Sequence, residues 1–176
     1  GKTLTIGGRG YTLSGRVDVS NVVLLAATGV NFGGEVAVGD LTLNGDSSAT
    51  FSGSDARLGA LSTAAASTLT VAGGGNLTLG GTVELGSAIV NNGTLAFASD
   101  VRLNLSGLTA ADGVYTLFTG NEVAGFADLN VDNITGINTV GYDWEFNANG
   151  TITSTINSEA YVYSGGTLSW DTTSAS

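Results

Sequence analysis

Residues 69–85 read Leu-Thr-Val-Ala-Gly-Gly-Gly-Asn-Leu-Thr-Leu-Gly-Gly-Thr-Val-Glu-Leu, and this stretch decides the fold. In its three packets, Leu69–Val71, Leu77–Leu79 and Val83–Leu85, apolar side chains alternate with a polar one. A period of two residues is typical of a β-strand with one buried face. Glycines separate the packets, and glycine permits the positive φ angles that tight turns need. The stretch therefore predicts short strands joined by tight turns.

Similar packets recur along most of the chain at intervals of about six to ten residues. They include Leu4–Ile6, Tyr11–Leu13, Val17–Val19, Val36–Val38, Leu41–Leu43 and Leu95–Phe97. The connections between them are too short for crossover helices, so a doubly wound α/β fold is excluded. The Ala-rich stretch 60–67 has Ser and Thr inside it and no convincing cap, and we expect a loop or one short turn there.

Two all-β architectures fit this pattern. The first is a parallel β-solenoid, in which each coil stacks on the one before and like residues form ladders. The recurrence of Leu-Thr-Ile, Leu-Thr-Leu and Leu-Thr-Val favours it. So does the absence of Pro, because hydrogen bonds between coils need every backbone N–H group. The alternative is an antiparallel β-sandwich.

The pattern of apolar segments changes near residue 100. Before it the packets are short and separated by glycines, and after it they lengthen and aromatic residues concentrate. We predict a solenoid body over residues 1–158, with coils over 1–100 and terminal coils or a cap over 101–158. A polar break at Asn157–Glu159 precedes residues 159–176, which we expect to form an extended tail or an assembly strand.

The composition excludes several classes of function. The 176 residues include neither Cys nor His, which rules out disulfides, thiolate metal sites and the usual nucleophile–base pairs. A net charge of −10 repels polyanions, so we expect no nucleic-acid partner. The longest apolar run, residues 22–27, is far shorter than the ~20 residues of a membrane-spanning helix, so we expect no membrane span in this chain. The absence of Met suggests a processed product or a fragment.

Two segments resemble a known protein family. Asn76–Val83 (Asn-Leu-Thr-Leu-Gly-Gly-Thr-Val) and Asn91–Leu95 (Asn-Asn-Gly-Thr-Leu) are similar to the passenger-associated β-strand repeats of bacterial autotransporters. Asp112–Phe118 and Ser164–Thr172 resemble segments that follow and open such repeat blocks. The resemblance implies a right-handed parallel β-helix that is exported to the bacterial cell surface and serves in adhesion or in display of other modules.

Three motifs suggest chemistry, and each has a simpler interpretation. Gly1-Lys2-Thr3 matches the end of a phosphate-binding loop, but a strand-like packet follows instead of the required helix. Asp128–Asn133 resembles the start of a calcium loop but lacks its turn glycine, and we expect a strand with Leu129 and Val131 inside. The acidic residues are scattered singly, so no catalytic pair is apparent. We therefore predict no catalytic residue, no metal and no cofactor.

Four aromatic residues near the C-terminus are the candidate contact residues: Trp144, Tyr161, Tyr163 and Trp170. Exposed aromatics anchor partners or stack on sugars, whereas buried ones would plug the end of the solenoid. Two functions remain open. The first is a non-enzymatic extracellular structural protein that forms a stalk, fibre or surface layer and self-associates head to tail or by strand donation. The alternative is an adhesin or binding module that contacts a host glycan or protein through these aromatics.

Overall fold

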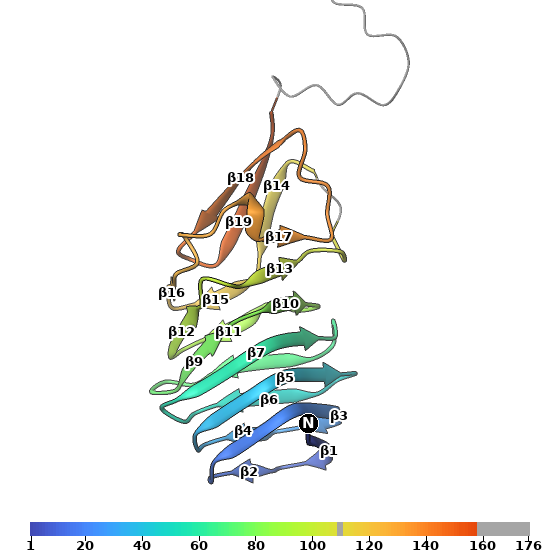
Figure 1. The fold of residues 1–176 in the computed structure, drawn as a ribbon, viewed down its shortest axis with the longest axis vertical. Helices are drawn as coiled ribbons and strands as arrows, with labels where there is room; N and C mark the ends of the chain where they lie inside the picture. Colours follow the sequence, from blue (N-terminus) through green and yellow to red (C-terminus); the bar gives the residue numbers. More distant parts are fainter. Residues whose placement is uncertain (109–110, 158–176) are drawn as a thin grey trace, which may run out of the picture.

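A computed structural model describes residues 1–108 and 111–157. They form a β-solenoid of about five turns, in which parallel strands stack along one axis (Figure 1). The predicted parallel solenoid is therefore confirmed, and the antiparallel sandwich is wrong for the body of the molecule. The predicted tail, residues 159–176, lies outside the described residues.

Two parallel sheets form the walls of the solenoid. The larger sheet contains β1 (Thr3–Arg9), β3 (Val17–Thr28), β5 (Val36–Asn44), β7 (Ala56–Thr63), β9 (Asn76–Leu79), β10 (Thr82–Leu85), β12 (Thr94–Phe97), β13 (Arg102–Asn104), β16 (Val123–Ala124) and β17 (Ile134–Thr135). The smaller sheet contains β2 (Thr12–Leu13), β4 (Val30–Phe32), β6 (Ser48–Phe51), β8 (Thr68–Val71), β11 (Ile89–Asn91) and β15 (Phe118–Gly120).

The interior is built from ladders of residues that occupy the same position in successive coils. Phe32 pairs with Phe51, Phe51 with Val71, and Val71 with Asn91, so each of these coils uses 19 or 20 residues. The rings of Phe32 and Phe51 stack with centroids 4.9 Å apart. Aromatic pairs of this kind contribute about 0.5–1.5 kcal/mol beyond the area that they bury. Every second side chain of a strand therefore points inward, and it forms a ladder with the residues at the same position in the neighbouring coils.

A column of glycines lets the coils approach each other at the turn between the smaller and the larger sheet. A Cβ atom on Gly34 would overlap the carbonyl oxygen of Gly15, and one on Gly53 would overlap that of Gly34. The atoms in the way belong to the backbone and cannot swing aside. Glycine is therefore required at these two positions by the spacing of the coils.

A third sheet covers the last coils. Strands β14 (Gly113–Thr116), β19 (Thr151–Ile156) and β18 (Tyr142–Asn147) pair antiparallel, in that order. We call this sheet the cap; it lies at the opposite end of the solenoid from the N-terminus (Figure 1). Beneath it, Phe97, Phe118, Phe126 and Phe146 contact one another with ring centroids 5.2–5.6 Å apart.

Two local expectations were wrong. Residues 60–63, expected in a loop, belong to β7, because Leu61 is buried and pairs with Leu41 on one side and Val83 on the other. Pairing with both neighbours overrides the helical preference of Ala. Residues 131–133 form a 3-10 helix, η1 (Val131–Asn133), instead of a strand, and Val131 is exposed. The cause is a capping box, in which the side chain of Asn130 accepts from Asp132 N–H and that of Asn133 accepts from Asn130 N–H.

Candidate functional site

Of the four predicted contact residues, the structure describes Trp144. It lies on β18, on the face of the cap that also carries the buried Phe146 and Ile152. Its ring is half-buried, stacks on Tyr115 at 6.1 Å and tilts against Tyr142 at 6.2 Å. Its Nε1–H donates to the Thr139 carbonyl oxygen at 3.4 Å. The other three residues, Tyr161, Tyr163 and Trp170, lie outside the described residues.

The first coil of the described structure has a neighbouring coil on one side only among residues 1–108 and 111–157. Within the described residues, β1 pairs with β3 alone and β2 pairs with β4 alone. Strand β1 covers β3 from Asn21 onward, so residues 17–20 of β3 have a neighbouring strand only on the side of β5. An edge of this kind presents unpaired backbone groups and is a template for another strand. We call β2, the turn at Gly15 and residues 17–20 the N-terminal edge.

Apolar side chains at this edge are less buried than their counterparts in later coils. Tyr11 is 42% exposed, whereas Val30, Ala49, Leu69 and Ile89, at the same position, are at most 2% exposed. Leu13 is half-buried, whereas Phe32 and Phe51 are fully buried. Among the described residues, the first coil therefore leaves its apolar side chains less covered than the later coils do.

The opposite end is closed by hydrogen bonds from the cap. The N–H groups of Leu117 and Phe118 both donate to Gly150 O, and Val123 N–H donates to Ala148 O. Both acceptors lie in the turn between β18 and β19, so the hairpin covers the last coil. Buried Asn91 also holds this end, because its Nδ2 donates to the carbonyl oxygens of Asn121 and Glu122 at 3.2 and 3.3 Å. The two ends of the solenoid thus differ in kind.

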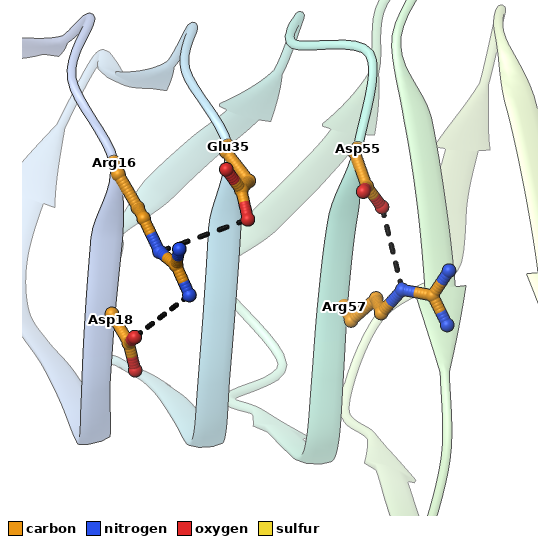
Figure 2. Close-up of polar contacts among 5 residues, drawn as sticks. All are labelled: Arg16, Asp18, Glu35, Asp55 and Arg57. Atoms are coloured by element: carbon orange, nitrogen blue, oxygen red, sulfur yellow. Dashed lines mark hydrogen bonds and ion pairs between the residues drawn. The ribbon is translucent and has the colours of Figure 1, made fainter.

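Three of the acidic residues, Asp18, Glu35 and Asp55, lie with two arginines on the outer face of the larger sheet (Figure 2). Arg16 contacts Asp18 at 2.9 Å and Glu35 at 3.7 Å, and Arg57 contacts Asp55 at 3.4 Å. All five side chains are at least half exposed, and such pairs contribute at most about 1 kcal/mol each. They keep this flat face hydrated and charged.

A hollow of about 480 Å³ opens between the last coils and the cap. Its wall includes Thr63, Leu85, Leu105, Tyr115 and Leu117. Thr63 stacks between Leu43 and Leu85 in an inward ladder, so its small side chain leaves space where leucines fill the neighbouring coils. The hollow is therefore mainly apolar, with the Tyr115 ring on one side.

The remaining motifs also have structural positions. Gly1-Lys2-Thr3 leads directly into strand β1, which is not the helix that a phosphate-binding loop requires. Among the described residues, no group of three or more His, Cys, Asp or Glu side chains is placed to hold a metal ion. Within residues 1–108 and 111–157, no helix is long and apolar enough to cross a membrane.

Comparisons with protein-family models, with curated proteins and with solved structures gave no match to this chain. The fold that the sequence resemblance implies, a β-helix, is present in the structure. No match assigns the chain to the autotransporter passengers, so the likeness to them is one of sequence pattern.

The aromatic residues of the sequence point to the C-terminus as the contact region and not to the N-terminal edge. The signal that reveals it is the recurrence of glycine before the strand packets, at Gly15, Gly34 and Gly53. Only the register of the coils shows that Gly34 and Gly53 each contact a preceding coil, whereas a Cβ on Gly15 would meet nothing within 4 Å.

Proposed function

We propose that this chain is an extracellular, non-enzymatic structural protein that resembles an autotransporter passenger. It forms a stalk, fibre or surface layer on a bacterial cell by self-association of its solenoids. The observation that carries the proposal is the stack of parallel coils, whose ladders run along one axis up to the cap, so the two ends of the stack are different surfaces. A contact that joins two different surfaces does not close on itself, so its repetition gives a fibre.

The composition and the surface support the same role. A solenoid gains stability from interfaces between neighbouring coils, and long ladders with hydrated outer faces suit a rigid spacer. Stacking of coils from different copies would extend the same backbone hydrogen bonds and apolar ladders, which is the contact that a spacer needs in order to become a polymer.

Sedimentation velocity over a range of protein concentrations tests this proposal. We expect larger species to appear as the concentration rises. We also expect association to strengthen from about 0.01 M to about 0.15 M salt, because the Debye length falls from ~30 to ~8 Å and screens the repulsion between copies. The net charge of −10 on each copy is the source of that repulsion. A single monomeric species at every concentration and salt level would contradict self-association.

A second candidate function, an adhesin, is favoured by the hollow beneath the cap. Tyr115 forms part of its wall, and aromatic rings stack on the apolar faces of sugars. The chain has two Trp residues, so the substitution Trp170→Phe leaves Trp144, stacked on Tyr115, as the single Trp whose emission is followed by selective excitation. A saturable change in its emission on titration with a panel of mono- and disaccharides would support a glycan adhesin, and no change across the panel would argue against one.

A further inference from the structure

The outer face of the smaller sheet is made of small, uncharged side chains. The six strands of this sheet stack along the solenoid (Figure 1), and one outward position at the centre of each strand forms a continuous ladder. The ladder consists of Thr12, Asn31, Thr50, Thr70, Val90 and Thr119. The six strands and the residues next to them contain no Asp, Glu, Lys or Arg over residues 10–15, 29–34, 47–53, 67–76, 86–95 and 117–121. We call the outward side chains of these strands the neutral face.

Charge lies on the other faces of the described molecule. The outer face of the larger sheet carries Asp18, Glu35 and Arg57, and the cap strand β18 exposes Asp143 and Glu145. The whole chain has a net charge of −10. A contact that brings like charges together costs several kcal/mol. The neutral face is therefore the surface through which two copies can pack without opposing one charge with its like.

Polar groups of the neutral face are hydrogen-bonded between neighbouring coils. The Oγ of Ser52 donates to Oδ1 of Asn31 at 2.8 Å, and the N–H of Gly29 donates to Oγ of Ser48 at 2.7 Å. A polar group that keeps a partner loses less free energy on leaving water than a group that is left unpaired. Covering this face therefore costs less than its polar composition alone suggests.

The shape of the neutral face suits packing against a second sheet. No register shift interrupts the pairing of its six strands, whereas the pairing of β1 with β3 shifts between Gly7 and Gly8. The largest side chains of its central ladder are those of Asn31 and Val90. Sheets with small side chains in regular ladders pack face to face about 10 Å apart and interdigitate.

The area of the neutral face sets the strength of such a contact. Six strands about 4.8 Å apart, each with about five residues at roughly 3.3 Å per residue, give a face of roughly 29 Å by 16 Å. Covering it on two copies removes about 900 Å² from water, which is below the ~1,200–2,000 Å² of a stable complex. One such contact is weak, but solenoids joined into a filament would repeat it, and repeated weak contacts reinforce one another.

We propose that the neutral face is a lateral contact between two copies of this chain, in which the smaller sheets pack back to back. This inference rests on the proposed self-association and adds a second contact to it. A face that packs against the same face of another copy makes an isologous contact, which closes at two. The account therefore predicts filaments that associate in pairs, and not bundles of increasing width, because the outward faces of a pair are charged.

A lysine in the central ladder tests this contact in the full chain. Thr70→Lys takes the net charge from −10 to −9, which lowers the general repulsion between copies. Lateral association should nevertheless weaken by about tenfold or more, because the ammonium group must leave water and meets a second lysine across the contact. The matched control is Thr42→Lys, at a half-buried outward position of β5 between Val23 and Ser62. Sedimentation velocity at high protein concentration measures the dimer, and far-ultraviolet circular dichroism checks the fold.

Cysteine cross-linking locates the contact, since the protein has no cysteine of its own. Thr50→Cys places one thiol near the centre of the neutral face. A bis-maleimide about 10 Å long, which matches the spacing of facing sheets, should link this variant into dimers and no larger covalent species. The yield should be roughly tenfold above that of Thr42→Cys, because only the thiols in the contact are held together.

The outcomes separate this inference from the proposed function. Filaments of single width, or equal cross-linking of Thr50→Cys and Thr42→Cys, would overturn the lateral contact and leave the proposed function standing. An equal response of dimerisation to the two lysine variants would also overturn it, as would a monomer in which Thr50→Cys is shielded from the linker by another part of the chain. Paired solenoids without filaments would support the lateral contact and contradict end-to-end stacking, and a chain that stays monomeric throughout would contradict both.

Discussion

Replacing Gly53 by Ala is expected to lower the free energy of unfolding by about 3 kcal/mol or more. The new Cβ would overlap the carbonyl oxygen of Gly34 and lie 3.1 Å from the carbonyl carbon of Gly33. These atoms belong to a coil that is paired on both sides, so relief would require breaking ladder hydrogen bonds. Urea denaturation followed by far-ultraviolet circular dichroism measures the loss.

Gly15→Ala is the matched control, because Gly15 belongs to the same column and its Cβ would meet nothing within 4 Å. In monomeric protein we expect this variant to unfold within about 0.5 kcal/mol of the wild type, or to be slightly more stable, since Ala restricts the unfolded chain. Equal destabilisation by both substitutions would show that the glycine column does not act through the spacing of the coils.

The substitution Asn91→Asp is expected to cost about 3–5 kcal/mol at neutral pH. Asn91 is fully buried, and its Nδ2 donates to two carbonyl oxygens of the turn at residues 121–122. A carboxylate of the same shape would place negative charge against these oxygens, with no cation to balance it. Because that turn leads into β16, the loss should spread to the last coils. Chemical denaturation of the variant measures the cost.

The pH dependence of the stability of Asn91→Asp shows whether the buried negative charge causes the loss. Burial raises the folded-state pKa of the introduced carboxyl above its unfolded value of about 4, so the folded variant is most stable below that pH. Its stability falls as the pH rises through the folded-state pKa. The gap from the wild type should therefore be smaller at about pH 4 than at pH 7. Asn92→Asp, at the exposed neighbouring position, should change stability by less than about 0.5 kcal/mol, and a comparable loss there would contradict the explanation.

The body of the solenoid is predictable from sequence because its determinants are local. Alternation of apolar and polar residues fixes which side chains point inward, and recurrence of the same packets fixes the stacking, as in the ladder of Val36, Ala56 and Leu77. Glycine turns between the packets set the length of each coil. Whether a residue of the body is buried could thus be predicted from the few residues on either side of it.

The cap and the N-terminal edge depend on contacts that are distant in sequence. Gly113 pairs with Ser154, and the turn at residues 148–150 hydrogen-bonds to the last coil. Because the partners are far apart in sequence, no local sequence pattern predicts either contact. The 3-10 helix at Val131–Asn133 arises from side-chain capping, which outweighs the alternation of apolar and polar residues that predicted a strand there. Gly15 looks like every other turn glycine until the register shows that nothing within 4 Å faces its side.

Electron micrographs of the purified full chain in negative stain, at about 0.15 M salt, test the central claim most directly. Self-association through two unlike ends predicts unbranched filaments that lengthen with protein concentration. Uniform single particles of the full chain at every concentration would contradict the account.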